Sequence, residues 1–225
     1  MIDTSKKTLR TAIFHGPSGS GKDTQLDLLE RTIDYERIGF SSLMEILKKE
    51  GHPRALSAYE NTRVGKLASD EDVYLIFEEW LPRLDPKKPW FFVSPVRKET
   101  QIDLFDKLVQ KFDRTLDLFV HFKLTESAAI ERMSLRTYCE KCGTTYHSLY
   151  KKEKKEGFCD NDGTPLVKRE DDNPDAIAKR LEWYNDDLKP ILDTYRSRGI
   201  LLEIDATPSI EVIHENLLKE LQKYA

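Results

Sequence analysis

Short apolar runs alternate along the chain with longer stretches in which apolar residues recur at helical spacing. The runs have the length of β-strands and lie at Leu9–His15, Glu36–Phe40, Trp90–Ser94, Leu116–Leu124 and Ile200–Ala206. The helical stretches include Ser42–Glu50, Asp70–Leu81, Gln101–Phe112 and Asp175–Gly199, and the last ends on a glycine, which is a common helix stop. Strands that alternate with helices predict an α/β fold with a mainly parallel sheet covered on both faces.

A glycine-rich loop connects the first predicted strand to the helix after it. The stretch HGPSGSGKDT, residues 15–24, fits the phosphate-loop pattern G-x-x-x-x-G-K-[ST] up to Lys22, but Asp23 stands where the pattern has serine or threonine. Gly19 and Gly21 let the backbone approach a phosphate, and the helix start attracts its negative charge. Lys22 extends toward the outer phosphates. Strand, loop and helix in this order predict a nucleotide phosphate site.

The segment Thr137–Thr164 interrupts this alternation and reads as an inserted module that holds all three cysteines. Its spacing C-x2-C-x16-C-x2-D forms two pairs, and each pair suits a tight turn that grips one edge of a metal ion. The four residues are Cys139, Cys142, Cys159 and Asp162. Zinc accepts sulfur and carboxylate ligands, and four protein ligands leave no open position, so we predict a structural zinc site. Asp160 or His147 stays open as the fourth ligand, and a metal-free module with three thiols is the other interpretation.

Composition narrows the class of protein. The chain has 225 residues, 39% hydrophobic and 34% charged, which is typical of a soluble globular protein. A net charge of −4 argues against a general nucleic-acid binder. No apolar run reaches the ~20 residues of a membrane span, and residues 1–16 lack the long apolar segment of a signal peptide. We therefore expect a cytoplasmic monomer that binds small-molecule nucleotides, and neither nucleic acid nor a membrane.

The loop GPSGSGKDTQ resembles that of the adenylate kinase family, in which the lysine is followed by glycine, threonine and glutamine. Further segments resemble the bacterial form with a long, zinc-binding lid: GKLASDEDV at 65–73, ERMSLRTYCEKCGTTYH at 131–147, LVKREDDNPDAIAKRL at 166–181 and LKPILDTYRSRGILLEIDA at 188–206. The resemblance implies a three-layer phosphate-loop sandwich with a five-stranded parallel sheet and two inserts. The core would comprise 1–38, 69–134 and 173–225, the monophosphate-binding insert 39–68 and the lid 135–172.

The resemblance also implies ATP-dependent phosphoryl transfer to a nucleoside monophosphate, such as ATP and AMP giving two ADP, with Mg²⁺ bound to ATP. Arg132 would pack on the ATP base, and Arg136 would reach the phosphates. The implied ATP-binding set is Gly19, Ser20, Gly21, Lys22, Asp23, Thr24, Arg132 and Arg136. The implied catalytic set is Lys22, Arg136, Arg169 and Arg180, with Asp171 and Asp172 steadying the lid arginines. The implied acceptor-binding set is Phe40, Glu45, Lys66, Leu67, Ala68, Arg97, Gln101, Arg169 and Arg180.

The acceptor side departs from the family pattern. The family has threonine at Phe40, glycine and aspartate at Ser41 and Ser42, and arginine at Glu45. Where the family has Asp-Gly-Phe-Pro-Arg, this chain has VSPVR at 93–97, so the carboxylate that anchors a magnesium-bound water is missing. A carboxylate at Glu45 predicts that AMP is a poor acceptor, unless Arg54 or Arg63 compensates.

Asp23 stands where the family has glycine, next to the loop lysine. Its carboxylate is an oxygen ligand that suits magnesium, so it is a candidate replacement for the strand-end aspartate lost at Val93. The alternative is that Asp23 turns outward as a first-turn acid, which stabilises the start of a helix.

Three other interpretations stay open. In the first, the acceptor is a nucleoside or another hydroxyl compound, and Glu45 is the general base. In the second, the chain is a relative that binds nucleotides without catalysis. The retained Lys22 and lid arginines disfavour this interpretation. A zinc-dependent nucleic-acid module is the weakest, because one zinc site without a basic excess does not support it.

Overall fold

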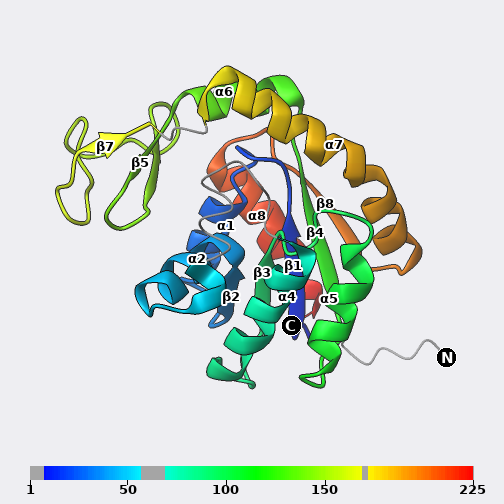
Figure 1. The fold of residues 1–225 in the computed structure, drawn as a ribbon. Coiled ribbons are helices and arrows are strands. Elements are labelled where there is room, and N and C mark those ends of the chain that lie inside the picture. The colour runs from blue at the N-terminus through cyan, green and yellow to red at the C-terminus, as the bar shows by residue number, and fades with distance from the viewer. Residues whose placement is uncertain (1–7, 57–68, 169–171, 225) are drawn as a thin grey trace.

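The computed structural model describes residues 8–56, 69–168 and 172–224. A five-stranded parallel sheet lies at its centre, in the order β2-β3-β1-β4-β8 (Figure 1). The strands are β1 (Thr11–His15), β2 (Glu36–Gly39), β3 (Trp90–Val93), β4 (Leu118–Lys123) and β8 (Leu201–Asp205). Buried apolar residues on both sides of each central strand are what a sheet covered on both faces requires.

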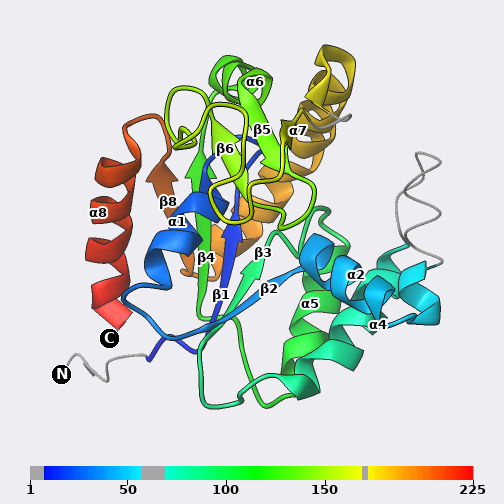
Figure 2. The ribbon, with the colours of Figure 1, turned by 90° about the vertical axis from the view of Figure 1, so that its left-hand side faces the viewer.

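Alternate residues of the strands feed two separate cores. On one face, Phe14 and Val120 pack with α1 (Lys22–Leu29) and α8 (Ile210–Leu221). On the other face, Ile13 and Phe119 pack with three helices, α4 (Asp70–Trp80), α5 (Gln101–Gln110) and α7 (Pro174–Ser197). Figure 2 shows α1 and α8 on one side of the sheet and α4 and α5 on the other. The result is a three-layer sandwich.

Capping residues fix where several helices begin. Ser69 accepts a hydrogen bond from the backbone N–H of Asp72 at the start of α4, and Asn173 accepts one from Ala176 at the start of α7. Such bonds satisfy N–H groups that the first helical turn leaves unpaired. Thr125 caps α6 (Glu126–Ser134) in the same way. The chain leaves the core after the end of α6 and returns to it at the start of α7, so the Asn173 cap marks the return.

Two further parts extend from the sandwich. Helix α2 (Phe40–Lys49) follows β2 directly and packs against α4 through Met44, Leu47 and Ile76. The cysteine module carries a small antiparallel sheet in the order β6-β5-β7 (Figure 1). Its strands are β5 (Arg136–Cys139), β6 (Thr145–His147) and β7 (Leu166–Val167). Two short 3-10 helices, Leu81–Arg83 and Gln222–Tyr224, complete the described elements.

The predicted α/β sandwich is confirmed, with all five predicted strands in one parallel sheet. The predicted helix stop is also confirmed, since α7 ends at Ser197 and Gly199 has a φ of 69°. One boundary was wrong: Phe40 was expected to end a strand, but it begins α2. The division of the chain into core, insert and lid ranges stays a prediction. Among the described residues, no helix combines the length and the apolar character needed to cross a membrane.

Candidate nucleotide and metal sites

The glycine-rich loop runs from the end of β1 to the start of α1, at the carboxyl edge of the sheet. Gly16 has no room for a side chain, because a Cβ there would lie 3.0 Å from the Cβ of Phe122. Gly19 has a φ of 82° and lies close to the Ala129 carbonyl of α6. Gly21, with a φ of 79°, caps α1 in the left-handed region that glycine favours. The loop therefore has a backbone that side chains would prevent.

Two side chains of the loop face a site for anions. The Ser20 Oγ is buried and has no hydrogen-bond partner within the described part of the chain. An unsatisfied buried hydroxyl is costly unless a ligand completes it. The Lys22 Nζ lies 3.5 Å from the Pro17 carbonyl. Burial lowers the pKa of Lys22, Asp23 opposes this, and Arg97, Arg136 and Arg37 lower it further. Several cations therefore gather around the loop, which suits a phosphate chain.

Arg132 lies on α6 beside the loop. Its guanidinium is 3.5 Å from the Gly19 carbonyl and 3.2 Å from the Thr207 carbonyl, both of which accept from it. The same group lies over the ring of Tyr150 in the cysteine module, 5.4 Å from the ring centre. A flat cation facing an aromatic ring offers a place where a planar base can stack.

Arg136 and Arg180 converge on one carboxylate. The buried side chain of Asp172, 2% exposed, accepts from Arg136 Nε at 2.8 Å and Nη2 at 2.6 Å, and from Arg180 Nη2 at 2.8 Å. Burial raises the pKa of Asp172, but the two arginines outweigh it and hold the pKa below its ordinary value. Arg136 begins the module and Arg180 belongs to α7, so Asp172 joins the module to the core.

The carboxyl end of β3 carries a residue in an unusual conformation. Ser94 has a φ of 45°, in the region that favours glycine, and its buried Oγ has no hydrogen-bond partner among the described residues. The family has glycine at this position, so Ser94 keeps the turn at the cost of backbone strain. Its carbonyl lies 3.4 Å from the Nε of Arg97, which therefore sits at the strand end beside the loop. Val93, the residue before, brings no carboxylate to this edge.

Gln101 is buried at the start of α5, and both ends of its amide have protein partners. Its Oε1 accepts from the backbone N–H of Arg97 at 2.6 Å, and its Nε2 donates to Asp70 Oδ1 at 2.7 Å. An amide nitrogen carries two hydrogens, so one donor is left for a base. The structure thus places Gln101 next to Arg97, as the acceptor set requires.

Helix α2 holds the two remaining described residues of the acceptor set. Phe40 is partly buried, and its ring meets that of Phe77 edge-on at 6.1 Å. Glu45 is exposed, three residues after Ser42. The Ser42 Oγ would lie 3.7 Å from a Cβ on Gly39 at the end of β2, so Ser42 faces the strand ends. Residues three apart share a helix face, but the role of Glu45 on the acceptor side stays a prediction.

Asp23 lies in the first turn of α1 and pairs with Arg37 of β2, with Oδ1 and Nη2 2.7 Å apart. The surrounding protein partly desolvates the Asp23 carboxylate and so raises its pKa, but Lys22 and Arg37 outweigh this effect and hold the pKa below its ordinary value. Both roles predicted for Asp23, magnesium ligand and first-turn acid, stay predictions. The ion pair with Arg37 is a contact that the sequence pattern did not indicate.

The cysteine module brings its four predicted ligands together. One ligand atom from each of Cys139, Cys142, Cys159 and Asp162 lies within 4.8 Å of the others. The Sγ atoms of Cys142 and Cys159 are 3.5 Å apart, near the ~3.8 Å edge of a zinc–sulfur tetrahedron. In both turns the glycine after the second ligand, Gly143 or Gly163, has a positive φ. Asp162 therefore occupies in its turn the place that Cys142 has in the other.

The alternative fourth ligands lie outside this cluster. The Nδ1 of His147 accepts from the backbone N–H of Leu149, and the Oδ1 of Asp160 accepts from that of Lys154. Only a small apolar cluster supports the module, formed by Cys139, Tyr146 and Cys159 with Leu166 against it. The donor set and the spacing fit a tetrahedral metal ion, and the small core leaves room for metal binding to contribute to folding.

Sequence reasoning missed a polar row behind the loop, in which two histidines are buried. His15, His121 and Glu203 are paired across the adjacent strands β1, β4 and β8. The His121 Nε2 lies 2.7 Å from the Tyr184 hydroxyl of α7, and the His15 ring stacks on Tyr184 at 5.4 Å. The signal was available, since two of the predicted strands carry a histidine near their carboxyl ends. Both histidines contact Tyr184, which lies about one turn after Arg180 in α7.

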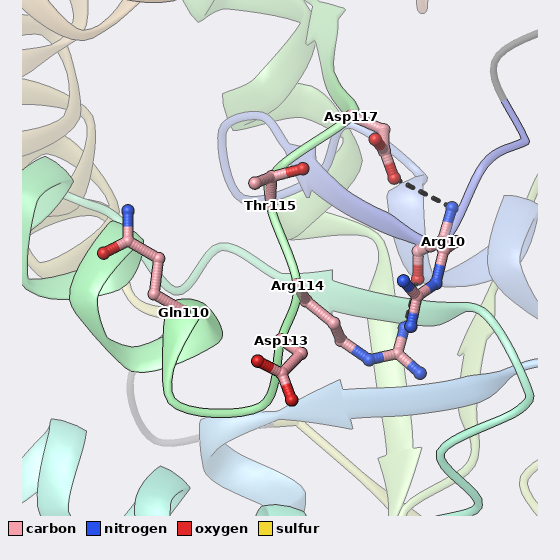
Figure 3. A pocket seen from close by; sticks show the side chains of 6 residues that line it. All are labelled: Arg10, Gln110, Asp113, Arg114, Thr115 and Asp117. Atoms are coloured by element: carbon pink, nitrogen blue, oxygen red, sulfur yellow. Dashed lines mark hydrogen bonds between the residues drawn. The ribbon is translucent and has the colours of Figure 1, made fainter.

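A pocket of about 330 Å³ lies elsewhere, at the amino ends of β1 and β4 (Figure 3). Its lining includes Arg114, whose guanidinium donates to the carbonyls of Arg10, Pro86 and Lys88 and lies over the ring of Trp90. These contacts link the segments that precede β1, β3 and β4. The pocket is at the opposite end of the sheet from the phosphate loop, so we assign it a structural role.

Four predicted site residues, Lys66, Leu67, Ala68 and Arg169, lie outside the described residues, as do Arg63 and Asp171. Of the described remainder, the loop residues and Arg97 lie at the carboxyl edge of the sheet, and the four metal-ligand candidates lie in the inserted module. A phosphate loop, arginines that face it and an inserted cysteine module at that edge define a phosphotransferase of the nucleoside monophosphate kinase class.

Comparison with known proteins narrows this class. The family model described as adenylate kinase matches residues 14–200. The adenylate kinase of Carboxydothermus hydrogenoformans is 32% identical over 211 residues, 94% of this chain and 99% of that protein. Those of Hydrogenobaculum sp. and Staphylococcus aureus are each 31% identical, over 91% and 92% of this chain and 97% and 96% of their own lengths. The chain belongs to the adenylate kinase family.

Proposed function

We propose that the chain transfers the terminal phosphoryl group of ATP to a nucleoside monophosphate. The observation that carries this is the loop itself: Gly19 and Gly21 are in the left-handed region, and the buried Ser20 Oγ has no partner among the described residues. Lys22 begins α1 there, with Arg97 and Arg136 near enough to lower its pKa. Phosphoryl transfer needs positive charge around the oxygens of the transferred group and little covalent chemistry from the protein. Family membership points to the same reaction.

The ATP side follows from the loop and the module. The loop N–H groups, Ser20 and Lys22 hold the phosphates, and Thr24 follows in the first turn of α1. The ATP base stacks on Arg132, where Tyr150 now lies. Arg136 and Arg180 bind the transferring group once it competes with Asp172 for them. Arg169 belongs to the same set by its place in the family pattern.

The acceptor side consists of Arg97 for the acceptor phosphate and Gln101 for its base, with Phe40 and Glu45 from α2. A fixed cation at the strand end favours an acceptor that carries a phosphate over a nucleoside. A carboxylate at Glu45 would repel the acceptor phosphate, so we propose that AMP or a related monophosphate is the acceptor and that AMP is used less well than by relatives with an arginine at this position. A hydroxyl acceptor with Glu45 as general base is the competing proposal.

Two metal ions complete the proposal. Zinc fits the Cys139, Cys142, Cys159 and Asp162 cluster and would stabilise the module without taking part in the reaction. Magnesium bound to ATP would neutralise phosphate charge. Asp23 remains an alternative magnesium ligand, direct or through water, but its carboxylate already pairs with Arg37 at 2.7 Å, which disfavours this role. We also propose that the protein works as a monomer in the cytoplasm on small-molecule nucleotides, without nucleic acid.

The test is a panel of acceptors with ATP and magnesium, read out as ADP formed. The panel contains AMP, the other nucleoside monophosphates and the corresponding nucleosides. Turnover with a monophosphate that falls sharply in Arg97→Gln supports the proposal. Turnover with nucleosides alone supports the competing one, with loss in Glu45→Gln. ATP binding without turnover of any acceptor would contradict both and favour a non-catalytic relative.

A further inference from the structure

Asp23 places a carboxylate beside a loop built to hold phosphates. It follows Lys22 directly, in the first turn of α1, and its side chain is 63% exposed. An unpaired negative charge at this point repels a bound triphosphate, and at several ångströms the repulsion is substantial near a protein surface. The fold must therefore offset this charge if the loop is to bind ATP.

Arg37 provides the opposite charge. It lies on β2, next to the buried Ile38, and its side chain crosses to α1 on the other face of the strand. Its Nη2 is 2.7 Å from Asp23 Oδ1, and its Nη1 is 2.7 Å from Asp27 Oδ1 and 3.6 Å from Glu30 Oε1. The three acids recur at positions that share one helix face. The guanidinium is thus held in place along α1 and is only 28% exposed.

We propose that Arg37 is a positioning residue of the phosphate site, which holds the Asp23 carboxylate turned away from the loop and neutralises its charge there. This inference rests on the proposed ATP-binding function. In this proposal Arg37 acts through Asp23 rather than on the nucleotide, because its two terminal nitrogens point to Asp23 and Asp27 of α1, each at 2.7 Å. Because the charges of Asp23 and Arg37 cancel, the position is close to neutral, as it is with the glycine that the family has there.

Electrostatic coupling within the site supports this assignment. Asp23 raises the pKa of Lys22 and Arg37 lowers it, so both charges of the pair act on the lysine that faces the phosphates. Removing Arg37 alone would leave Asp23 unbalanced in that field. Removing both would leave the field close to that of an ordinary loop. The two substitutions must therefore be non-additive, and the second must reverse the effect of the first.

The test is a double-mutant cycle with Arg37→Gln, Asp23→Asn and the double variant, measured by titration of ATP in EDTA and again with magnesium. Arg37→Gln should weaken ATP binding roughly tenfold, with the larger loss in EDTA and at low salt. Asp23→Asn in the same background should restore binding to within about twofold of wild type. Arg37→Lys keeps the charge and should recover most of the affinity.

Glu30→Gln is the matched control, because it removes another carboxylate partner of Arg37, two turns from the loop. Its ATP affinity should equal that of wild type, while thermal melting of each variant separates binding from loss of fold. Persistent weak binding in the double variant would overturn the inference, since it would mean that Arg37 contacts the nucleotide or that Asp23 is needed for magnesium. If wild type binds ATP but turns over no acceptor, the proposed reaction is contradicted. The double-mutant cycle still tests the role of Arg37, because it measures ATP binding alone.

Discussion

Acid should destabilise this protein in a range of pH where its carboxylates are still ionised, because His121 is buried as the neutral ring. Burial lowers the pKa of His121 to about 4, and although Glu203 opposes the shift, Lys123 and Arg196 add to it. The ring is 4% exposed, and its Nε2 is in hydrogen-bond contact with Tyr184. The unfolded chain, with an ordinary pKa of 6.5, takes up the proton first.

The sign and size of the effect follow from linkage. Above pH 6.5 both states have a neutral ring, and nothing changes. Between pH 6.5 and about 4 the unfolded state binds more protons, so the free energy of unfolding falls as the pH falls. From pH 7 to pH 5 the loss due to His121 alone is about 2 kcal/mol. His15 adds in the same direction, because burial also lowers its pKa.

The assay is denaturant unfolding of wild type and His121→Gln at pH 7 and pH 5. Glutamine keeps a polar group near the Tyr184 hydroxyl but does not titrate. The variant should be less stable at pH 7, yet lose about 2 kcal/mol less than wild type on going to pH 5. The difference between proteins cancels the other histidines and the cysteine cluster, which are common to both. An equal loss in the two proteins would refute the reasoning, since it would mean that the folded state protonates His121 as readily as the unfolded one.

Three further predictions concern the module, the acceptor and the lid arginines. Purified protein should contain about one zinc per chain, and Cys142→Ser should lower the melting temperature more than the ATP affinity; a metal-free wild type of equal stability would contradict this. Glu45→Arg should raise AMP turnover at least tenfold, because a charge-assisted hydrogen bond contributes about 1.5–3 kcal/mol; micromolar saturation of wild type with AMP would show that Glu45 faces away. Asp172→Asn should destabilise the fold by about 3 kcal/mol, since it leaves two partly buried arginines without their carboxylate; unfolding measured at neutral pH checks it.

The sequence predicted the sheet well because its signals are local. The central strands β1, β3 and β4 are short apolar runs that are buried on both faces, so the run itself marks the strand. The error at Phe40 has the same origin. An aromatic residue after Glu36–Gly39 extends the apolar run, but Phe40 packs on Phe77 of α4, which lies far along the chain. The local pattern carries no information on this tertiary contact, so it did not indicate that Phe40 begins a helix.

The metal cluster was predictable for a similar reason. Its candidate ligands come from two turns of the same form, so their spacing in the sequence fixes their spacing in the fold, and the structure brings Asp162 to within 4.8 Å of the three cysteine sulfurs. The ion pair of Asp23 and Arg37 was not predictable in this way. This ion pair joins α1 to the edge strand β2, and its two residues are 14 positions apart in the sequence. The local pattern around either residue does not indicate that the two side chains pair.

The positions that depart from the family pattern belong together in the fold. Relative to that pattern, the chain gains a carboxylate at Asp23, loses one at Val93 and exchanges a cation for a carboxylate at Glu45. Gly39 pairs with Val93 at the ends of β2 and β3, and α2 begins at the next residue, so these changes all lie at the same edge of the sheet. Counting charges, the three positions change from neutral to −2, and Arg37 offsets only Asp23. The uncompensated charge is therefore on the acceptor side. Every nucleoside monophosphate carries the same phosphate charge as AMP, so this excess predicts weaker binding of any monophosphate than in relatives with an arginine in place of Glu45, while the ATP side keeps its balance.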